Sequence, residues 1–103
     1  MWFLLHALTL AAPNDGSSVE ATQIIEVRSV YRACIADVVA IRPKDESPDL
    51  ALGIALERCR GAELTLRGLL RKAHGSNAAD TFAVIVDTRL DGQEAGIKRR
   101  EAR

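Results

Sequence analysis

Cys34 and Cys59 are the residues of this chain best placed to do chemistry, and they are its only two cysteines. Such a pair can form a disulfide, bind a metal ion or supply a thiol nucleophile. A metal site is disfavoured, because there is no Cys-x-x-Cys pair and only His6 and His74 could add nitrogen ligands. A reactive thiol needs a nearby base, and His74 lies about four helical turns beyond Cys59. We therefore expect no catalytic residue, no metal and no cofactor.

A disulfide between the two cysteines fits the expected helices around them. If helices at about 18–42 and 48–74 pair as an antiparallel hairpin, Cys34 and Cys59 lie about 12 and 16 Å from the turn, at 1.5 Å per residue. Closing a loop of about 25 residues would contribute on the order of 3 to 4 kcal/mol in the chain-entropy model. The sequence thus predicts a Cys34–Cys59 disulfide. The alternative is two free thiols buried as small core residues.

The first expected helix, 18–42, begins at Ser17–Glu20, where a hydroxyl precedes a carboxylate by three residues, the spacing of a capping box. It should end before Pro43, since proline cannot continue the hydrogen-bond ladder. Between these signals, apolar side chains recur every three or four residues and define a buried face. They are Ile24, Val27, Tyr31, Cys34, Val38 and Ile41.

The second expected helix, 48–74, begins with a Ser47 cap and with Pro48 at the first helical position. Gly75 is its expected C-cap. Three glycines inside it are either weak helix positions or points of close approach by another helix, and the sequence leaves both readings open. They are Gly53, Gly61 and Gly68.

The third expected helix, 77–91, is capped by Ser76 or Asn77. A strand over Thr81–Val86 is the alternative, because that stretch is rich in β-forming residues. Gly92 and Gly96 should loosen the end of the helix, and 98–103 should be a frayed basic tail. The stripe expected to face the core comprises Ala78, Ala79, Phe82, Ala83, Val86 and Leu90.

The N-terminal stretch is an uncharged apolar run that ends in small residues. It predicts a signal peptide over 1–11 and a turn or linker over 12–17, although the usual basic start is absent. The alternative is a short first helix packed on the rest of the protein. The run is too short to span a membrane, which takes roughly 20 residues, so no membrane span is expected.

The overall charge disfavours a general polyanion binder, since 14 Lys and Arg balance 14 Asp and Glu. With only four aromatic side chains there is little to stack on bases, and no nucleic-acid partner is expected. A single helical domain over 18–97 is all that 103 residues allow. The one candidate contact with a polyanion is the tail, with Lys98, Arg99, Arg100 and Arg103.

The pattern Tyr31-Arg32-Ala33-Cys34, with Ala55 to Cys59, Ala62-Glu63 and Leu66-Arg67, resembles a group of small uncharacterised two-cysteine helical exported proteins of Gram-negative bacteria. The similarity covers roughly residues 24–70. The chain departs from the pattern in its leader, which lacks a basic start, and in its β-rich Thr81–Val86 stretch. The resemblance implies a periplasmic helical domain with a disulfide, and it implies no activity.

These observations predict an all-α protein in which a disulfide-linked antiparallel helical hairpin carries a third helix packed across it. We expect it to be periplasmic or secreted and non-catalytic. Its expected role in the cell envelope is structural or in protein interaction, through an apolar helix face that meets a protein partner or a second copy. The alternative is a cytoplasmic helical binding or regulatory module with free thiols and a basic tail.

Overall fold

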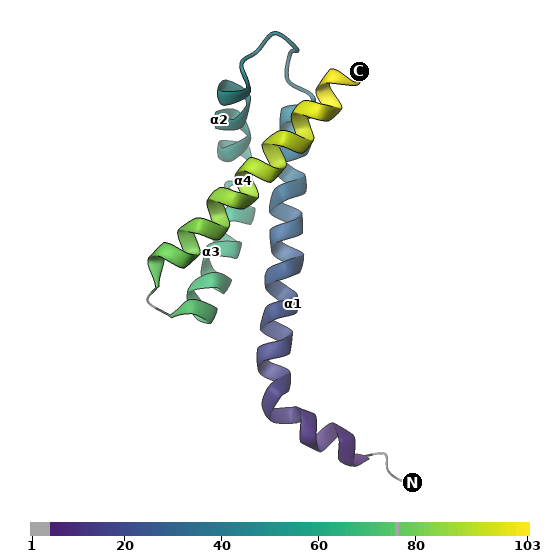
Figure 1. The fold of residues 1–103 in the computed structure, drawn as a ribbon, viewed down its shortest axis with the longest axis vertical. Helices are drawn as coiled ribbons and strands as arrows, with labels where there is room; N and C mark the ends of the chain where they lie inside the picture. The colour runs from purple at the N-terminus through teal and green to yellow at the C-terminus, as the bar shows by residue number, and fades with distance from the viewer. Residues whose placement is uncertain (1–4, 76) are drawn as a thin grey trace.

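The computed structural model describes residues 5–75 and 77–103, and every regular element in these ranges is a helix (Figure 1). The elements are α1 (Leu5–Ala40), α2 (Pro48–Arg58), α3 (Arg60–His74) and α4 (Ala78–Glu101). The all-α prediction is confirmed, and Thr81–Val86 is helix rather than strand. A strand there would have had no neighbouring strand to pair with among the described residues.

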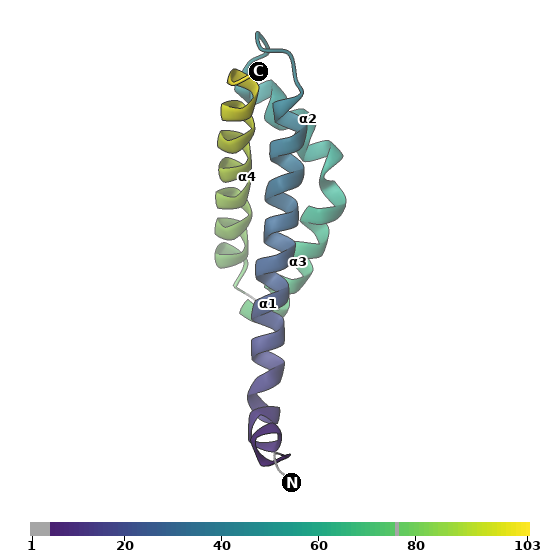
Figure 2. The ribbon, with the colours of Figure 1, turned by 90° about the vertical axis from the view of Figure 1, so that its right-hand side faces the viewer.

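The first helix is longer than expected, because the 12–17 stretch predicted as a turn lies inside α1. Pro13 lies inside α1, where it has no N–H to donate, and a proline at an interior position either bends a helix or ends it. Figure 1 shows such a bend in the purple N-terminal part of α1, which extends beyond the other helices in both ribbon views (Figure 2). Residues 1–4 lie outside the described residues, and cleavage of a signal peptide over 1–11 stays a prediction.

The predicted helix 48–74 is interrupted at Cys59, which ends α2 and precedes the first residue of α3. Its backbone angles, φ −99° and ψ 17°, depart from helical values. Backbone hydrogen bonds still bridge the break, from Cys59 N to Ala55 O and from Glu63 N to Cys59 O. The break falls at the residue bonded to α1, and both α2 and α3 pack on α1 on either side of it. The second helix of the expected hairpin therefore forms as two helices, α2 and α3, whereas the first is continuous within α1.

The predicted start at Ser17–Glu20 is wrong, because this segment lies inside α1, but the signals at the ends of the later helices are confirmed. Ser47 Oγ accepts a hydrogen bond from Leu50 N at 3.1 Å, with Pro48 as the first residue of α2. Gly75 ends α3 with φ 63°, a left-handed conformation that glycine adopts without strain. Asn77 caps α4 by accepting from Asp80 N.

The core lies where α1 meets the other three helices, and α4 packs along α1 most extensively. Tyr31, Ile35 and Val39 form the buried centre of α1, one helical turn apart. The other helices add small and aliphatic side chains around them. These are Ala51, Ala55, Cys59, Leu66, Leu70 and Ile85.

Gly92 and Gly96 bring α4 into close contact with α1. A Cβ on Gly92 would lie 2.9 Å from the Ile35 side chain, and one on Gly96 would lie 2.6 Å from Val39 Cβ. The expectation that these glycines loosen the helix is therefore wrong: they allow the two backbones to approach, and α4 continues to Glu101. At the glycines of α2 and α3 an added Cβ would meet nothing within 4 Å, so they mark no close approach.

Candidate functional site

The Cys34–Cys59 disulfide joins α1 to the junction between α2 and α3, with a Cα–Cα distance of 5.9 Å. Cys59 is buried, and Cys34 packs against the same core. The predicted disulfide is confirmed, and the alternative of two free thiols does not describe this structure. With both sulfur atoms bonded to each other, neither is available as a nucleophile.

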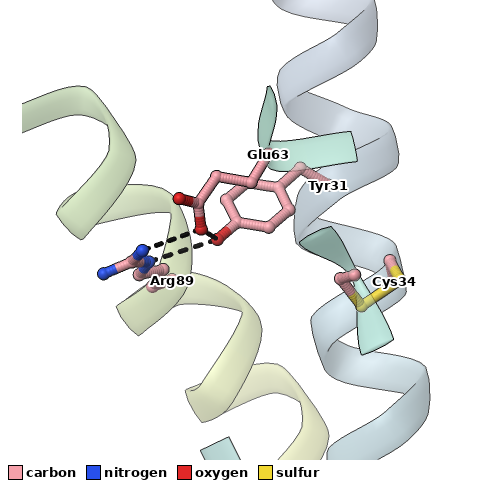
Figure 3. Close-up of a disulfide and its surroundings, with 5 residues drawn as sticks. Tyr31, Cys34, Glu63 and Arg89 are labelled. Carbon is pink, nitrogen blue, oxygen red and sulfur yellow. Dashed lines mark hydrogen bonds and ion pairs between the residues drawn. A yellow bond between two sulfur atoms is a disulfide. The ribbon is translucent and has the colours of Figure 1, made fainter. Parts of the chain in front are cut away.

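A polar junction of Tyr31, Glu63 and Arg89 lies one helical turn from the disulfide. Tyr31 is three residues before Cys34 on α1, and Glu63 is four residues after Cys59 on α3. Tyr31 Oη donates to Glu63 Oε1 at 2.5 Å, and Arg89 Nη2 of α4 donates to the same oxygen at 2.7 Å. Figure 3 shows these three side chains converging from three different helices.

Two further contacts complete the polar junction. Arg89 Nε donates to Tyr31 Oη at 3.2 Å, and Arg67 Nε donates to Glu63 Oε2 at 2.9 Å. The Glu63 carboxylate thus receives hydrogen bonds on both oxygens. Charge-assisted bonds of this kind are roughly twice as strong as neutral ones, so the junction ties α1, α3 and α4 together.

The electrostatics of the junction favour a structural role over a catalytic one. Burial opposes the charge on Glu63, but hydrogen bonds from Tyr31, Arg89 and Arg67 outweigh it and lower the pKa of Glu63 to about 2. Burial and the hydrogen bond to Glu63 raise the pKa of Tyr31 to about 12. A general acid or base works best with a pKa near the operating pH. Neither group meets that condition.

A second polar contact links α1 to α4 beside the junction. The buried Thr88 hydroxyl donates to Val84 O at 2.7 Å and accepts from Arg28 Nε at 2.9 Å. The sequence pattern gave no sign of this contact. The Glu63–Arg67 pair could have been recognised, because acid and base lie four residues apart on one helix face.

The predicted basic tail is instead the last turn of α4, docked against the 41–47 loop. Arg100 is buried and its Nη1 donates to Pro43 O at 3.0 Å, while Arg103 Nη2 donates to Arg42 O at 3.0 Å. Arg99 pairs with Asp37 at 2.7 Å. The expectation of fraying is wrong, because these guanidinium contacts with loop carbonyls and with Asp37 hold the tail in place. Polyanion binding by Lys98 and these arginines stays a prediction, and it would have to compete with these contacts.

The apolar stripe predicted to face the core lies on the outer side of α4. Phe82 is 57% exposed and Leu90 is 53% exposed, with Val86 half-buried between them. Ala79 and Ala83 beside them are exposed as well. The buried face of α4 has Ile85 as its one large aliphatic side chain, and its other members are threonine, glycine or arginine: Thr81, Ile85, Thr88, Gly92, Gly96 and Arg100. We call Ala79, Phe82, Ala83, Val86 and Leu90 the α4 apolar stripe.

Among the described residues, no three His, Cys, Asp or Glu side chains gather where they could hold a metal ion. None of the helices described is both long and apolar enough to cross a membrane. Comparison with protein-family models, curated proteins and solved structures finds no match.

Proposed function

We propose that this protein is exported to the periplasm and has a non-catalytic role in the cell envelope, as a structural or protein-interaction module. The disulfide supports the proposed compartment, because such bonds persist where the environment is oxidising. The apolar N-terminal stretch supports export through a signal peptide. The pKa values of Glu63 and Tyr31, far from neutrality on opposite sides, support a role without acid–base catalysis.

The observation that carries the interaction role is the orientation of α4. Besides Ile85, the helix fully buries only threonine, glycine and arginine residues, and it leaves Phe82 and Leu90 more than half exposed, with Val86 half-buried between them. Exposed apolar area has a cost of roughly 25 cal/mol per Å² relative to burial. A contiguous apolar face on a small protein is typical of an interaction site. The α4 apolar stripe is therefore the proposed contact surface.

A second copy of the chain is the partner that the stripe fits best. Ala79 and Ala83 flank Phe82, so across a two-fold axis the ring of one copy can fit beside the alanines of the other. The formal net charge of zero produces no overall repulsion between copies. The proposed assembly is a dimer through antiparallel α4 helices.

Oligomeric state tests this contact. Sedimentation equilibrium of the oxidised protein should give a dimer that Phe82→Ser or Leu90→Ser converts to a monomer. Leu64→Ser is the matched control, because Leu64 is 55% exposed on α3 outside the stripe. A wild-type monomer at all concentrations would rule out the second copy. A dimer that persists in all three variants would show that the interface lies outside the α4 apolar stripe.

The compartment is tested separately by intact mass of the protein from its native cell, with and without reduction before thiol alkylation. The proposal expects a mass without about the first eleven residues, with both thiols blocked until reduction. A full-length mass with two alkylated thiols would instead favour the cytoplasmic binding module.

A further inference from the structure

A shallow pocket lies between the second half of α3 and the first turn of α4. It has a volume of about 250 Å³ and is lined by Arg67, Arg71, Gly75, Ala78 and Thr81. This is smaller than the roughly 300 to 1,000 Å³ of sites for drug-sized ligands. We propose that the pocket binds a small phosphate group, either free phosphate or a phosphomonoester.

Two guanidinium groups supply the positive charge. Arg67 and Arg71 lie four residues apart on α3, so their side chains project from the same face. Arg67 donates to Glu63 through Nε, so its two Nη groups remain to donate to a ligand. Within the described ranges, Arg71 has no ion-pair partner. The planar guanidinium presents a fork of N–H donors that matches phosphate oxygens.

The N-terminus of the 24-residue helix α4 adds backbone donors. Asn77 Oδ1 accepts from Asp80 N, and Thr81 N donates to Asn77 O at 3.4 Å. The N–H groups of Ala78 and Ala79 come earlier in the same turn, where a helix has no internal acceptors for them. The positive end of the helix dipole favours an anion there. Asp80 is the acid in this turn, and its carboxylate accepts from Asn77 Nδ2.

The Thr81 hydroxyl is the independent sign of a missing ligand. Thr81 lines the pocket and is only 5% exposed, yet its Oγ1 has no hydrogen-bond partner among the described residues. Thr65 and Thr88, by contrast, each donate to the carbonyl four residues earlier in their helices. A buried hydroxyl without a partner is costly, and a phosphate oxygen in the pocket would accept its hydrogen bond.

Phosphate binding is tested on the oxidised full-length protein by isothermal titration and by thermal unfolding, in sodium phosphate and in sodium chloride of equal ionic strength. Phosphate, but not chloride, should raise the midpoint of unfolding in a saturable way. Arg71→Ala should weaken binding about tenfold or more, the loss of a charged hydrogen bond. Arg60→Ala removes the same charge from α3 outside the pocket, and it should leave binding unchanged.

Thr81→Val separates a ligand role from a structural one. The variant should raise the unfolding midpoint in chloride, because an unsatisfied buried hydroxyl is gone, and should weaken phosphate binding roughly threefold to tenfold. Thr88→Val is the control, because it breaks two satisfied hydrogen bonds: it should lower the midpoint and leave binding unchanged. Wild-type protein that does not distinguish phosphate from chloride would overturn the proposal, as would Thr81→Val with unchanged affinity.

A comparison of ligands identifies the source of the phosphate group. Tighter binding of glycerol 3-phosphate than of inorganic phosphate would show that the pocket takes a phosphomonoester. Equal binding of the two would show that it takes the phosphate group alone. Binding of acetate as tight as phosphate would overturn the assignment of a phosphate site.

Discussion

Tyr31 donates a hydrogen bond to Glu63 one helical turn from the Cys34–Cys59 bond, so a covalent link and a charged network hold the same place on α1 and α3. Arg89 extends this contact to α4. Three of the four helices are therefore fixed relative to one another within about two helical turns. This arrangement makes the stability of the protein sensitive to pH at both extremes.

Acid should destabilise the protein through Glu63. The pKa of this carboxyl is about 2 in the folded chain against 4.5 ordinarily, so folding is favoured while the carboxylate is charged. This stabilisation is complete above pH 4.5 and is lost as the pH falls toward 2. It amounts to at most about 3 kcal/mol. Urea unfolding of wild type and Glu63→Gln should show a gap in stability at pH 7 that closes by pH 2. A gap of constant size would contradict this role.

Base should destabilise the protein through Tyr31. Because its pKa is raised to about 12 from 10.0, the folded chain holds the phenol proton more tightly. The contribution to stability is full below pH 10 and is lost as the pH rises toward 12. Tyr31 is the only tyrosine, so absorbance at 295 nm reports its ionisation directly. Ionisation of Tyr31 near pH 10 in the folded protein would disprove the buried hydrogen bond. The control variant Tyr31→Phe should show no change in absorbance from a phenol.

Loss of the disulfide should lower stability strongly. Cys34→Ser frees a loop of about 25 residues and should reduce the free energy of unfolding by about 2 to 4 kcal/mol. For a domain of this size that corresponds to a fall of roughly ten degrees or more in the unfolding midpoint. Circular dichroism melts with and without a reducing agent measure the effect. The reducing agent should lower the unfolding midpoint of wild type toward that of the variant and leave the midpoint of the variant unchanged. Equal midpoints for the two proteins without a reducing agent would contradict the stabilising role.

Local signals in the sequence predicted local features well. The Ser47 cap and the Gly75 stop depend only on neighbouring residues, and the disulfide depends only on how two adjacent helices align. All three are present. The prediction for the packing of α4 is wrong, because the apolar stripe with Phe82 faces outward and another face of the helix is buried. Gly92 allows the backbones of α4 and α1 to approach closely, and this places the face with Gly92, rather than the face with Phe82, against α1. The polar junction was missed, because no local pattern joins residues that far apart in the sequence.

Alanine substitutions should change stability in opposite directions at different glycines. Gly96→Ala should destabilise the protein by about 1 to 3 kcal/mol, because the new Cβ would lie 2.6 Å from Val39 Cβ. Gly53→Ala is the matched control on α2, where nothing lies within 4 Å of the added Cβ. It should stabilise the protein by up to about 1 kcal/mol through helix propensity alone. Urea unfolding at neutral pH measures both. If Gly96→Ala also stabilised the protein, α4 could not pack against α1 as closely as described.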